Sequence, residues 1–303
     1  MAKGRNLGKV DEAEILVGIV TLNRLEKLLR TLKECRSLGF YQFVVVDNGS
    51  TDGTRDFLRG QTDILFIFPE QNEGGSGGFG RIMRHFFEQT TFDYLLLMDD
   101  DAYPNFGRDR LARTLADHSP QSYMAYACKV TYPDGTLCEM NRPGKNVLLY
   151  HPLLHGTKDF HLNDDSRETV VDFAGFVGLV LTREAIRSFG VVSKHFFIYS
   201  DDTYYTLSIS RKGGKILYCP QLVFTHDCKR SSRNFTHHDQ IRIERDVVNK
   251  IVMIREYSSF AKLYIFLYLI RLLWKNPQIS VDILRAAHKG ISANLSLFRN
   301  QPI

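Results

Sequence analysis

Four short runs of apolar residues alternate with helical patterns in the N-terminal third of the chain, and this alternation constrains the fold more than any other feature. The runs are ILVGIV at 15–20, YQFVVVD at 41–47, DILFIFPE at 63–70 and DYLLLMDDD at 93–101. Strands that are apolar without interruption are typical of sheets covered on both faces. When helices separate such strands, the sheet is mainly parallel. We therefore predict an α/β fold with helices on both faces of a mainly parallel sheet.

The remaining segments extend this prediction along the chain. Helices are expected at 25–38, 54–60 and 79–90, and from about residue 239 onward. The less regular middle is expected to hold strands and turns at 123–135 and 170–186, then an extended segment, a helix and a strand pair within 194–227. Trp274 and Pro277 bracket a break in the C-terminal helical region.

Polar residues gather where the predicted strands end. They are Thr21, Asn23, Arg24, Asp47, Asn48, Asp99, Asp100 and Asp101. In open α/β sheets, ligands bind beyond the carboxyl ends of the strands. The sequence therefore predicts a ligand site at this edge of the sheet.

The triple aspartate is the most informative of these segments. Side chains alternate between the two faces of an extended chain, so Asp99 and Asp101 point to one side and Asp100 to the other. Two carboxylates on one side suit Mg²⁺ or Mn²⁺, with the phosphates of a ligand completing the coordination. A solvated acidic turn is the simpler alternative, but such turns rarely follow an apolar run like LLLM directly.

Residues 75–80 match the dinucleotide-binding pattern G-x-G-x-x-G, which raises the alternative of a nucleotide-cofactor oxidoreductase. In that fold the first glycine follows its strand almost directly. Here residues 69–74 intervene, which predicts a longer, flexible loop ahead of a helix that starts near Phe79. The dinucleotide pattern also belongs to the first strand of its domain, whereas two strand–turn units precede this one. In addition, a ribose site needs one carboxylate, and this chain offers three in Asp99, Asp100 and Asp101. We therefore expect the glycines to bring the backbone close to a different nucleotide ligand.

Basic residues outnumber acidic ones in residues 229–303, whereas the rest of the chain is slightly acidic. The longest apolar stretch, 260–275, is interrupted by Lys262 and Arg271 and is too short to span a bilayer. Its mixed aromatic and aliphatic residues favour contact with an anionic membrane surface over nucleic acid. A helix buried in an ordinary core fits this stretch equally well. A basic membrane- or nucleic-acid-binding module would explain this region but not the aspartates.

The five cysteines are scattered and odd in number, with no C-x-x-C pair. This spacing predicts mostly buried free thiols in a reducing compartment rather than a disulfide framework or zinc ribbon. The N-terminal segment lacks an apolar core, so we do not expect a secretory signal.

Seven segments occur in a characteristic order: IVTLNR, VVVDNGSTDGT, NEGGSGGFGR, LLLMDDDA, FAGFVGLVLTREA, FIYSDDTYY and FTHD. Together they make the chain, over about residues 15–230, resemble the family 2 glycosyltransferases of GT-A fold. The N-x-GG-x-GGF form of the glycine segment is similar to bacterial galactofuranosyltransferases and their rhamnosyltransferase relatives, which build cell-wall, capsule and O-antigen polysaccharides. The chain is shorter than the large polymerases of that group and looks more like the short members. The resemblance implies a catalytic domain at 1–238 and a basic, helical C-terminal region at 239–303.

The resemblance also implies an inverting transfer of a hexose from a nucleotide-diphosphate sugar, with Mn²⁺ or Mg²⁺ as cofactor. The implied metal ligands are Asp99, Asp101 and His226. The implied catalytic base is Asp202, with Asp201 as the alternative. The residues expected to contact the donor are Thr21, Asn23, Arg24, Asp47, Asn72, Gly77, Gly78, Arg81, Asp99 and Asp100.

Some of these residues have a simpler interpretation. Ser200, Asp201 and Asp202 are also the residue types that favour the N-cap and first turn of a helix. A single histidine after an apolar strand, like His226, is usually a packed or hydrogen-bonded residue. Only the resemblance to the family favours the catalytic and metal-binding roles over these alternatives.

The chemistry implied by the resemblance has few requirements. A single in-line displacement needs one base to accept the proton of the acceptor hydroxyl, and a divalent cation stabilises the departing diphosphate. UDP-galactofuranose is the first choice of donor and dTDP-rhamnose the second. A lipid-linked or polysaccharide glycan is the expected acceptor, and no nucleic-acid partner is expected. These expectations imply a cytoplasmic protein, peripheral on the inner face of the cell membrane.

Overall fold

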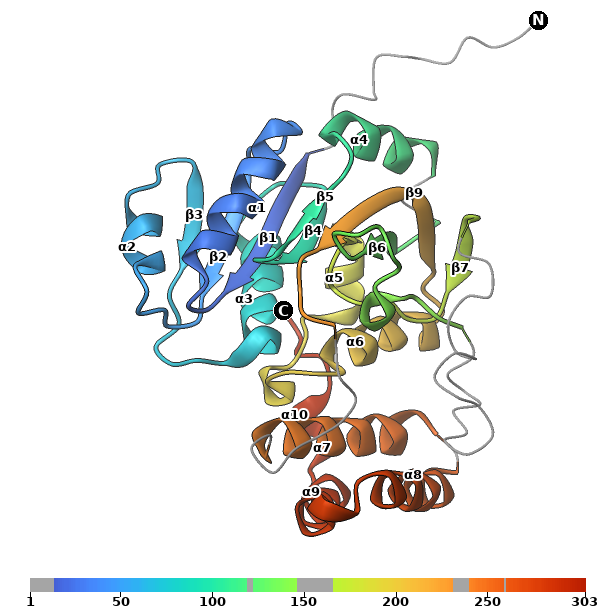
Figure 1. Ribbon diagram of the computed structural model, residues 1–303. Coiled ribbons are helices and arrows are strands. Elements are labelled where there is room, and N and C mark those ends of the chain that lie inside the picture. Colours follow the sequence, from blue (N-terminus) through green and yellow to red (C-terminus); the bar gives the residue numbers. More distant parts are fainter. Residues whose placement is uncertain (1–13, 119–121, 146–165, 231–239, 259) are drawn as a thin grey trace, which may run out of the picture.

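The computed structural model describes residues 14–118, 122–145, 166–230, 240–258 and 260–303. A single sheet lies at the centre of the molecule, with strand order β3-β2-β1-β4-β8-β6-β9-β5 and with β7 paired to β9 (Figure 1). The strands are β1 (Ile15–Thr21), β2 (Phe43–Asp47), β3 (Ile64–Ile67), β4 (Tyr94–Asp99), β5 (Ala102–Pro104), β6 (Ala125–Thr131), β7 (Thr169–Val171), β8 (Leu179–Thr182) and β9 (Ile216–His226). The α-helices are α1 (Leu25–Ser37), α2 (Thr54–Arg59), α3 (Gly74–Gln89), α4 (Arg108–Asp117), α5 (Arg183–Phe189), α6 (Asp201–Arg211), α7 (Gln240–Tyr257), α8 (Ala261–Lys275), α9 (Ser280–Ser292) and α10 (Leu295–Phe298).

The first half of the sheet is parallel, as the alternation of apolar runs and helices predicts. Strand β1 pairs in parallel with both β2 and β4, and β2 pairs in parallel with β3. Beyond β4 the sheet is mixed, because β8 runs antiparallel to both of its neighbours while β6 and β9 are parallel to each other. The predicted α/β class with a mainly parallel sheet is confirmed.

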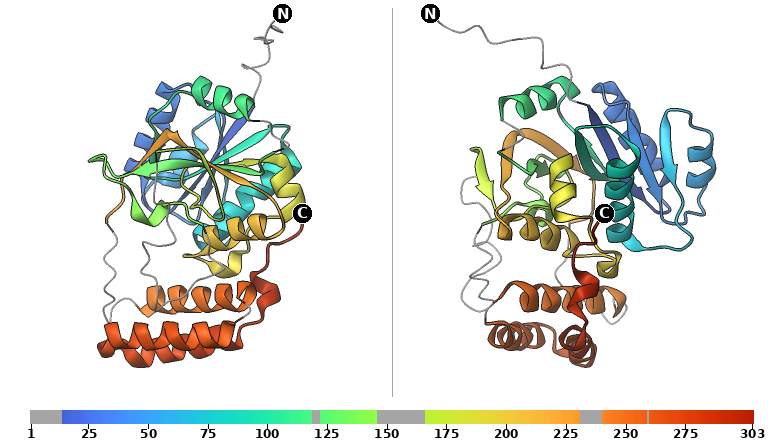
Figure 2. Two further views of the ribbon diagram at one scale, coloured as in Figure 1. Left: turned by 90° about the vertical axis from the view of Figure 1, so that its right-hand side faces the viewer. Right: turned by 180° about the vertical axis from the view of Figure 1, so that it is seen from behind.

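Helices cover both faces of the sheet, which explains why its central strands are apolar without interruption. Strand residues alternate between two cores: Val17 and Ile19 pack with α1, α2 and α4, whereas Leu16 and Val44 pack with α3, α5 and α6. Helix α1 lies in front of the sheet in Figure 1, and α3 and α5 face the viewer in the reverse view of Figure 2. The predicted cover on both faces is therefore confirmed.

The segment expected to form a strand pair near residue 220 is a single long strand, so that expectation was wrong. Strand β9 runs through Pro220 without a turn and pairs with β6 on both sides of a register shift between Cys128 and Lys129. Proline lacks a backbone donor for the ladder and is tolerated at such irregularities. The second part of β9 also pairs with β5, which brings His226 opposite Ala102.

Helix α3 begins at Gly74 and not near Phe79, so the glycines are part of the helix, whereas residues 68–73 form the loop that the sequence predicted ahead of it. Glycine disfavours helices in isolation, but here it lets the helix lie unusually close to its neighbours. A Cβ atom at Gly78 would lie 2.7 Å from Cγ1 of Val20, and one at Gly80 would lie 2.7 Å from the carbonyl oxygen of Val192. Tertiary packing thus outweighs the local preference of the glycine segment.

The C-terminal helices pack together at one end of the molecule, beyond α6 (Figures 1 and 2). They form a third core that also contains Phe196, Tyr204 and Leu207 from the preceding part of the chain. The predicted break is confirmed, because α8 ends at Lys275 and a short 3₁₀ turn follows at Pro277–Ile279. None of the helices in the described part of the chain is long and apolar enough to cross a membrane.

Candidate active site

The sheet brings the predicted strand-end residues to one edge. In the parallel registers Thr21 lies opposite Asp47, and Val20 lies opposite Asp99. The carboxyl ends of β1, β2 and β4 therefore meet, as expected from the alternating pattern. His226 reaches the same edge from the other half of the sheet, at the end of β9.

Asp47 shapes the loop that follows β2, and Asn23 joins that loop to the one that follows β1. Oδ1 of Asp47, which is fully buried, accepts hydrogen bonds from the backbone N–H groups of Ser50 at 2.9 Å and Gly49 at 3.3 Å. Oδ1 of Asn23 accepts a hydrogen bond from the backbone N–H of Thr51 at 2.7 Å. Asn23 has a φ of 53°, a conformation that asparagine tolerates better than most residues. Both residues therefore shape this edge of the site whether or not they contact a ligand.

Asp100 is held by two residues at and just beyond the end of β1, and the same nitrogen of Arg24 contacts both Asp100 and Asp101. Its Oδ2 accepts a hydrogen bond from Oγ1 of Thr21 at 2.7 Å, and its Oδ1 accepts one from Arg24 at 3.2 Å. Burial raises the pKa of Asp100 to about 6, although Thr21 and Arg24 oppose the shift. Three of the predicted donor-binding residues are thus bound to one another.

Asp99, Asp101 and His226 form a compact cluster whose candidate ligand atoms lie within 4.8 Å of one another. Nε2 of His226 lies 3.2 Å from Oδ1 of Asp101 and 3.7 Å from Oδ2 of Asp99. The side chain of Asp101 is 2 % exposed and that of Asp99 is 42 % exposed, so the cluster opens to solvent on one side.

The chemistry of this cluster fits a divalent cation. Oδ1 of Asp101 is buried and makes no regular hydrogen bond among the described residues, and its polar neighbour is Nε2 of His226 at 3.2 Å, a candidate ligand itself. Two carboxylates and an imidazole nitrogen are ligands suited to Mn²⁺ or Mg²⁺. The residues present therefore match the metal site that the sequence predicted.

Positive charge surrounds Asp101. Its Oδ2 accepts hydrogen bonds from Arg24 at 2.8 Å and from Nζ of Lys27 at 3.1 Å. Burial alone would raise the pKa of Asp101, but His226, Arg24 and Lys27 outweigh it and lower that pKa to about 2. Burial lowers the pKa of His226, but Asp101 outweighs burial and raises that pKa to about 10. Lys27 carried no motif signal, and the sequence reasoning missed it.

Asn141 orients the imidazole of His226 and was also missed. Its Oδ1 lies 2.8 Å from Nδ1 of His226 and accepts that N–H, which leaves Nε2 facing the carboxylates. Such an outer hydrogen bond sets the tautomer of a metal-binding histidine. Asn141 ends a 3₁₀ turn, Glu139–Asn141, and no pattern in the sequence distinguishes it from other polar residues.

Asp201 and Asp202 open helix α6, as the helix-cap interpretation expected. Ser200 is the N-cap residue of α6, but its side chain makes no capping hydrogen bond to the helix. Oδ1 of Asp202 accepts hydrogen bonds from the backbone N–H of Thr203 at 2.6 Å and from its hydroxyl at 3.2 Å. Burial and the charge of Asp202 raise the pKa of Asp201 to about 8. Burial raises the pKa of Asp202 to about 6.

Gly175 lies between Asp202 and Asn141, the residue that contacts His226. A Cβ atom at Gly175 would lie 3.3 Å from Oδ2 of Asp202 and 3.0 Å from Nδ2 of Asn141, whose Oδ1 contacts His226. The absence of a side chain at this position therefore brings Asp202 to the side of the site where His226 lies.

The loop that leads into α6 is strained. Phe197, Tyr199 and Ser200 have φ values of 61°, 69° and 61°, and each such residue costs about 1–3 kcal/mol. Nδ2 of Asn249 in α7 donates to the carbonyl oxygens of Phe196, Ile198 and Tyr199 at 3.0, 2.8 and 2.9 Å. These three hydrogen bonds hold the loop in place.

The glycine-segment residues have partners within the protein. Oδ1 of Asn72 accepts the N–H of Gly74 at 2.8 Å. Arg81 donates to both carboxylate oxygens of Glu73, at 2.6 and 3.1 Å, and Lys194 donates to Oε1 at 3.2 Å. A Cβ atom at Gly77 would lie 2.3 Å from Cβ of Glu73. Glu73, which the sequence reasoning did not single out, is the centre of this ion-pair cluster.

Comparison with known proteins connects this geometry to a family. The sequence profile described as Glycosyl transferase family 2 matches residues 16–176, which is just over half of the chain. This match spans the glycine segment and argues against the oxidoreductase interpretation. The chain has no significant match among curated proteins.

Several solved structures share the fold at low sequence identity. The crystal structure of GalNAc-T7 with UDP, GalNAc and Mn²⁺ has a TM-score of 0.61 and 13 % identity over 95 % of this chain, which spans only 56 % of the length of GalNAc-T7. The mannosyltransferase PcManGT from Pyrobaculum calidifontis, in complex with GDP-Man and Mn²⁺, has a TM-score of 0.52 and 16 % identity over 94 % of this chain and 77 % of its own. S. aureus TarS 1–349 in complex with UDP-GlcNAc has a TM-score of 0.57 and 12 % identity over 92 % of this chain and 80 % of its own. The expected GT-A-like arrangement is confirmed, and the chain belongs to glycosyl transferase family 2.

Proposed function

We propose that this protein transfers a hexose from a nucleotide-diphosphate sugar to a glycan acceptor, with inversion at the sugar carbon and with Mn²⁺ or Mg²⁺ as cofactor. The observation that carries this proposal is the cluster of Asp99, Asp101 and His226 at the carboxyl edge of the sheet. Asp202 lies on the neighbouring element, separated from Asn141 by Gly175. A cation-binding cluster beside an ionisable carboxylate is what a single displacement of a diphosphate requires.

Asp99, Asp101 and Nε2 of His226 would hold the cation. The bound cation supplies a Lewis acid that stabilises the negative charge of the departing diphosphate. Arg24 places a further positive charge beside the two buried aspartates. Electrostatic groups of this kind act strongly in a site shielded from water.

We assign the base to Asp202 because its Oδ2 faces Gly175 on the side of Asn141 and His226, and the order of the two pKa values agrees with this choice. With a pKa of about 6, Asp202 is mostly ionised at neutral pH and can accept the proton of the acceptor hydroxyl. Asp201, with a pKa of about 8, is mostly protonated at the same pH. Thr203 holds Oδ1 of Asp202, so the proton would go to Oδ2, on the side of Gly175.

The donor pocket is proposed at the ends of β1 and β2. We propose that Thr21, Asn23, Arg24 and Asp47 line the nucleoside site and that Asp100 fixes Thr21 and Arg24 there. Asn72, Gly77, Gly78 and Arg81 remain proposed contacts to the sugar or diphosphate. Their contacts within the protein show that they also support the start of α3.

The proposed donor is UDP-galactofuranose, with dTDP-rhamnose as the second choice. The N-x-GG-x-GGF form of the glycine segment supports this order. The solved relatives bind UDP with GalNAc, GDP-Man and UDP-GlcNAc. Because these ligands differ in both base and sugar, the donor of this chain is a question for experiment.

The test is a transfer and hydrolysis screen of the purified protein with Mn²⁺ against a panel of nucleotide sugars. We expect one donor to be consumed, and we expect Asp101→Asn to abolish its turnover while the protein remains folded. The circular dichroism of the variant provides the control for folding. Full activity of both Asp99→Ala and Asp101→Ala in the presence of EDTA would refute the assignment of the metal site.

We further propose that the acceptor is lipid-linked and that α8 and α9 contact an anionic membrane surface on the cytoplasmic side. Helix α8 buries Tyr264, Ile265 and Tyr268 and turns another face to solvent. The exposed apolar residues of the two helices are Leu263, Phe266, Ile270, Trp274, Val281, Leu284 and Ile291. The neighbouring basic residues are Lys262, Lys275, Arg285 and Lys289. An apolar face flanked by basic residues is typical of interfacial helices.

Substitution of the exposed aromatic residues tests this surface. Phe266 and Trp274 are 60 % and 81 % exposed, and burial of each in the interface contributes about 1.5 kcal/mol or more. We expect the double variant Phe266→Ser/Trp274→Ser to bind vesicles containing phosphatidylglycerol about 100-fold more weakly, or weaker still. Tyr41→Ser, which changes a 60 % exposed aromatic residue on the sheet side, is the matched control. Equal sedimentation of all three proteins with vesicles at low salt would refute the proposal.

A further inference from the structure

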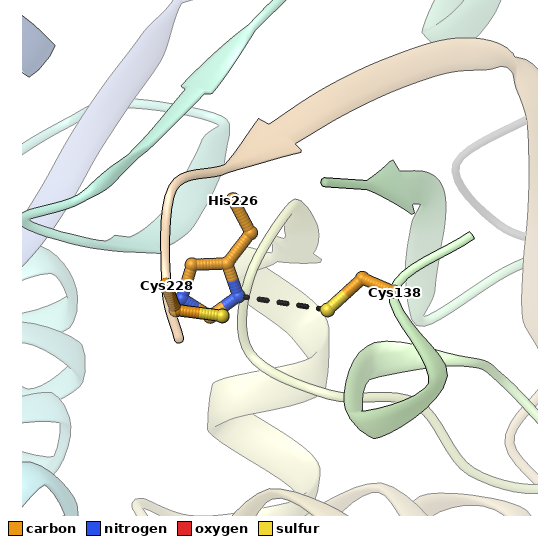
Figure 3. Close-up of side chains that lie close together, drawn as sticks. All are labelled: Cys138, His226 and Cys228. Carbon is orange, nitrogen blue, oxygen red and sulfur yellow. Dashed lines mark hydrogen bonds between the residues drawn. The ribbon is translucent and has the colours of Figure 1, made fainter. Parts of the chain in front are cut away.

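Two cysteines lie on the side of His226 that faces away from the carboxylates. Sγ of Cys138 lies 4.0 Å from Nδ1 of His226, and the candidate ligand atoms of Cys138, His226 and Cys228 all lie within 4.8 Å of one another. Figure 3 shows the three side chains converging from two segments: Cys138 from the turn after β6, and His226 with Cys228 from the end of β9. All five cysteines are free thiols, and all but Cys228 are buried, as the sequence predicted.

We propose that Cys138, His226 and Cys228 form a second cation site, for a thiophilic ion such as Zn²⁺. Thiolate sulfur and imidazole nitrogen are the ligands that zinc prefers. Bonds of about 2.3 Å to sulfur and about 2.0–2.1 Å to nitrogen place the ligands of a tetrahedral ion about 3.5–3.8 Å apart. The observed separations are slightly longer than this, so the ligands would move closer on binding and Oδ1 of Asn141 would give up its bonds to Nδ1 of His226 and Sγ of Cys138.

The surroundings of the cluster supply a fourth donor and a path to solvent. The thioether sulfur of Met140 lies 3.7 Å from Sγ of Cys228, and thioether joins thiolate among the ligands that select soft ions. Met140 is 51 % exposed and Cys228 is partly exposed, whereas Cys138 is fully buried. An ion can therefore enter from the side of Met140 and Cys228 and be held on the buried side by Cys138.

Proton balance follows from the hydrogen bonds of Asn141. Its Oδ1 accepts from Nδ1 of His226 at 2.8 Å and from Sγ of Cys138 at 3.2 Å, so the metal-free arrangement is protonated at both atoms. Binding of the ion to two thiolates and Nδ1 would release both thiol protons to solvent, together with the proton on Nδ1. The two thiolates then balance the two positive charges of the ion.

The two cation sites share one imidazole and therefore compete. A neutral imidazole has a single nitrogen lone pair for a metal. When Nδ1 of His226 binds an ion beside the thiols, Nε2 carries the proton and is lost to the cluster with Asp99 and Asp101. A thiophilic ion would then weaken binding of Mn²⁺ at the carboxylates, and this consequence for activity rests on the proposed transferase function.

Cobalt(II) is the probe that separates the two sites. It is added to the purified full-length protein after reduction with a phosphine that contains no thiol. We expect a sulfur-to-cobalt charge-transfer band in the near ultraviolet that saturates at one equivalent and disappears when Zn²⁺ displaces the cobalt. The band should be lost in Cys138→Ser and in Cys228→Ser, and it should persist in Asp101→Asn. Cys35→Ala, which removes a buried thiol outside the cluster, is the matched control and should retain it.

The absence of a charge-transfer band, or its persistence in both thiol variants, would overturn the proposal. A mass lower by two hydrogens, with a disulfide between Cys138 and Cys228 that survives reduction, would also overturn it and assign the pair to a disulfide. Inhibition by Zn²⁺ gives a second readout, since Cys228→Ser should require about tenfold more Zn²⁺ for the same inhibition of Mn²⁺-dependent transfer. If no nucleotide sugar is consumed, the proposed function fails, while the cobalt spectrum still decides whether the thiol site exists.

Discussion

Asp201 combines deep burial with an adjacent carboxylate, and this combination predicts a strong dependence of stability on pH. It is 8 % exposed, and burial together with Asp202 raises its pKa to about 8. An aspartate in the unfolded chain has a pKa of about 3.9. Between these two values the unfolded chain loses the proton while the folded chain keeps it. The free energy of unfolding therefore falls as the pH rises from about 4 to about 8.

The magnitude follows from the distance between the two pKa values. At pH 7 the unfolded carboxyl is about three pH units above its pKa, and each unit corresponds to about 1.4 kcal/mol. This gives an upper value of about 4 kcal/mol for Asp201 alone. Because Asp201 and Asp202 titrate as a pair, part of the effect belongs to Asp202. We therefore expect Asp201→Asn, which keeps the shape and removes the charge, to raise the free energy of unfolding by about 2–4 kcal/mol at pH 7.

The assay is urea denaturation in the presence of EDTA at several pH values from about 5 to about 8, where the expected gain grows with pH. Asp56→Asn is the control, because the side chain of Asp56 is 84 % exposed and its loss should change stability by no more than about 0.5 kcal/mol. The reasoning is refuted if the stability curves of the wild type and Asp201→Asn stay parallel over this range. The reasoning is also refuted if Asp201→Asn is less stable than the wild type at the highest pH of this range.

Two further predictions concern the base and the glycine segment. The rate of sugar transfer should increase as the pH rises through about 6, where Asp202 loses its proton. The variant Asp202→Asn should bind the donor in calorimetry but should not transfer the sugar. Turnover in that variant, with loss of turnover in Asp201→Asn, would assign the base to Asp201. Gly80→Ala should lower the free energy of unfolding by about 1–3 kcal/mol, because its Cβ would lie 2.7 Å from the carbonyl oxygen of Val192. Gly75→Ala should be neutral or stabilising by up to about 1 kcal/mol, since no described atom lies within 4 Å of its Cβ, and equal effects of the two alanines would contradict this account.

The parallel half of the sheet could be predicted because its signal is local. Each of β1, β2 and β4 is an uninterrupted apolar run that ends in polar residues, and parallel strands bring such ends to one edge. The approach of His226 to Asp99 and Asp101 could not be predicted in this way. It depends on the pairing of β9 with β5, which no periodicity encodes, and only the resemblance to a family suggested it.

The residues that sequence reasoning missed have roles created by packing. Asn141 orients His226 because a short turn carries it there, and Glu73 binds Arg81 and Lys194 because α3 begins five residues earlier than its helix propensity suggests. The start of α3 was predicted wrongly for the same reason, because the close contacts of its glycines with Val20 and Val192 exist only in the folded chain.

The three hydrogen bonds from Asn249 have a consequence for dissecting this protein. They tie helix α7 to the strained loop that ends at Ser200, one residue before the carboxylate pair. Removal of the C-terminal helices would therefore allow this loop to relax and would displace Asp202 from its position beside Gly175. If α8 and α9 bind a membrane and Asp202 is the base, as proposed, truncation would remove both functions together. Point substitutions on the outer faces of α8 and α9 are therefore needed to separate them.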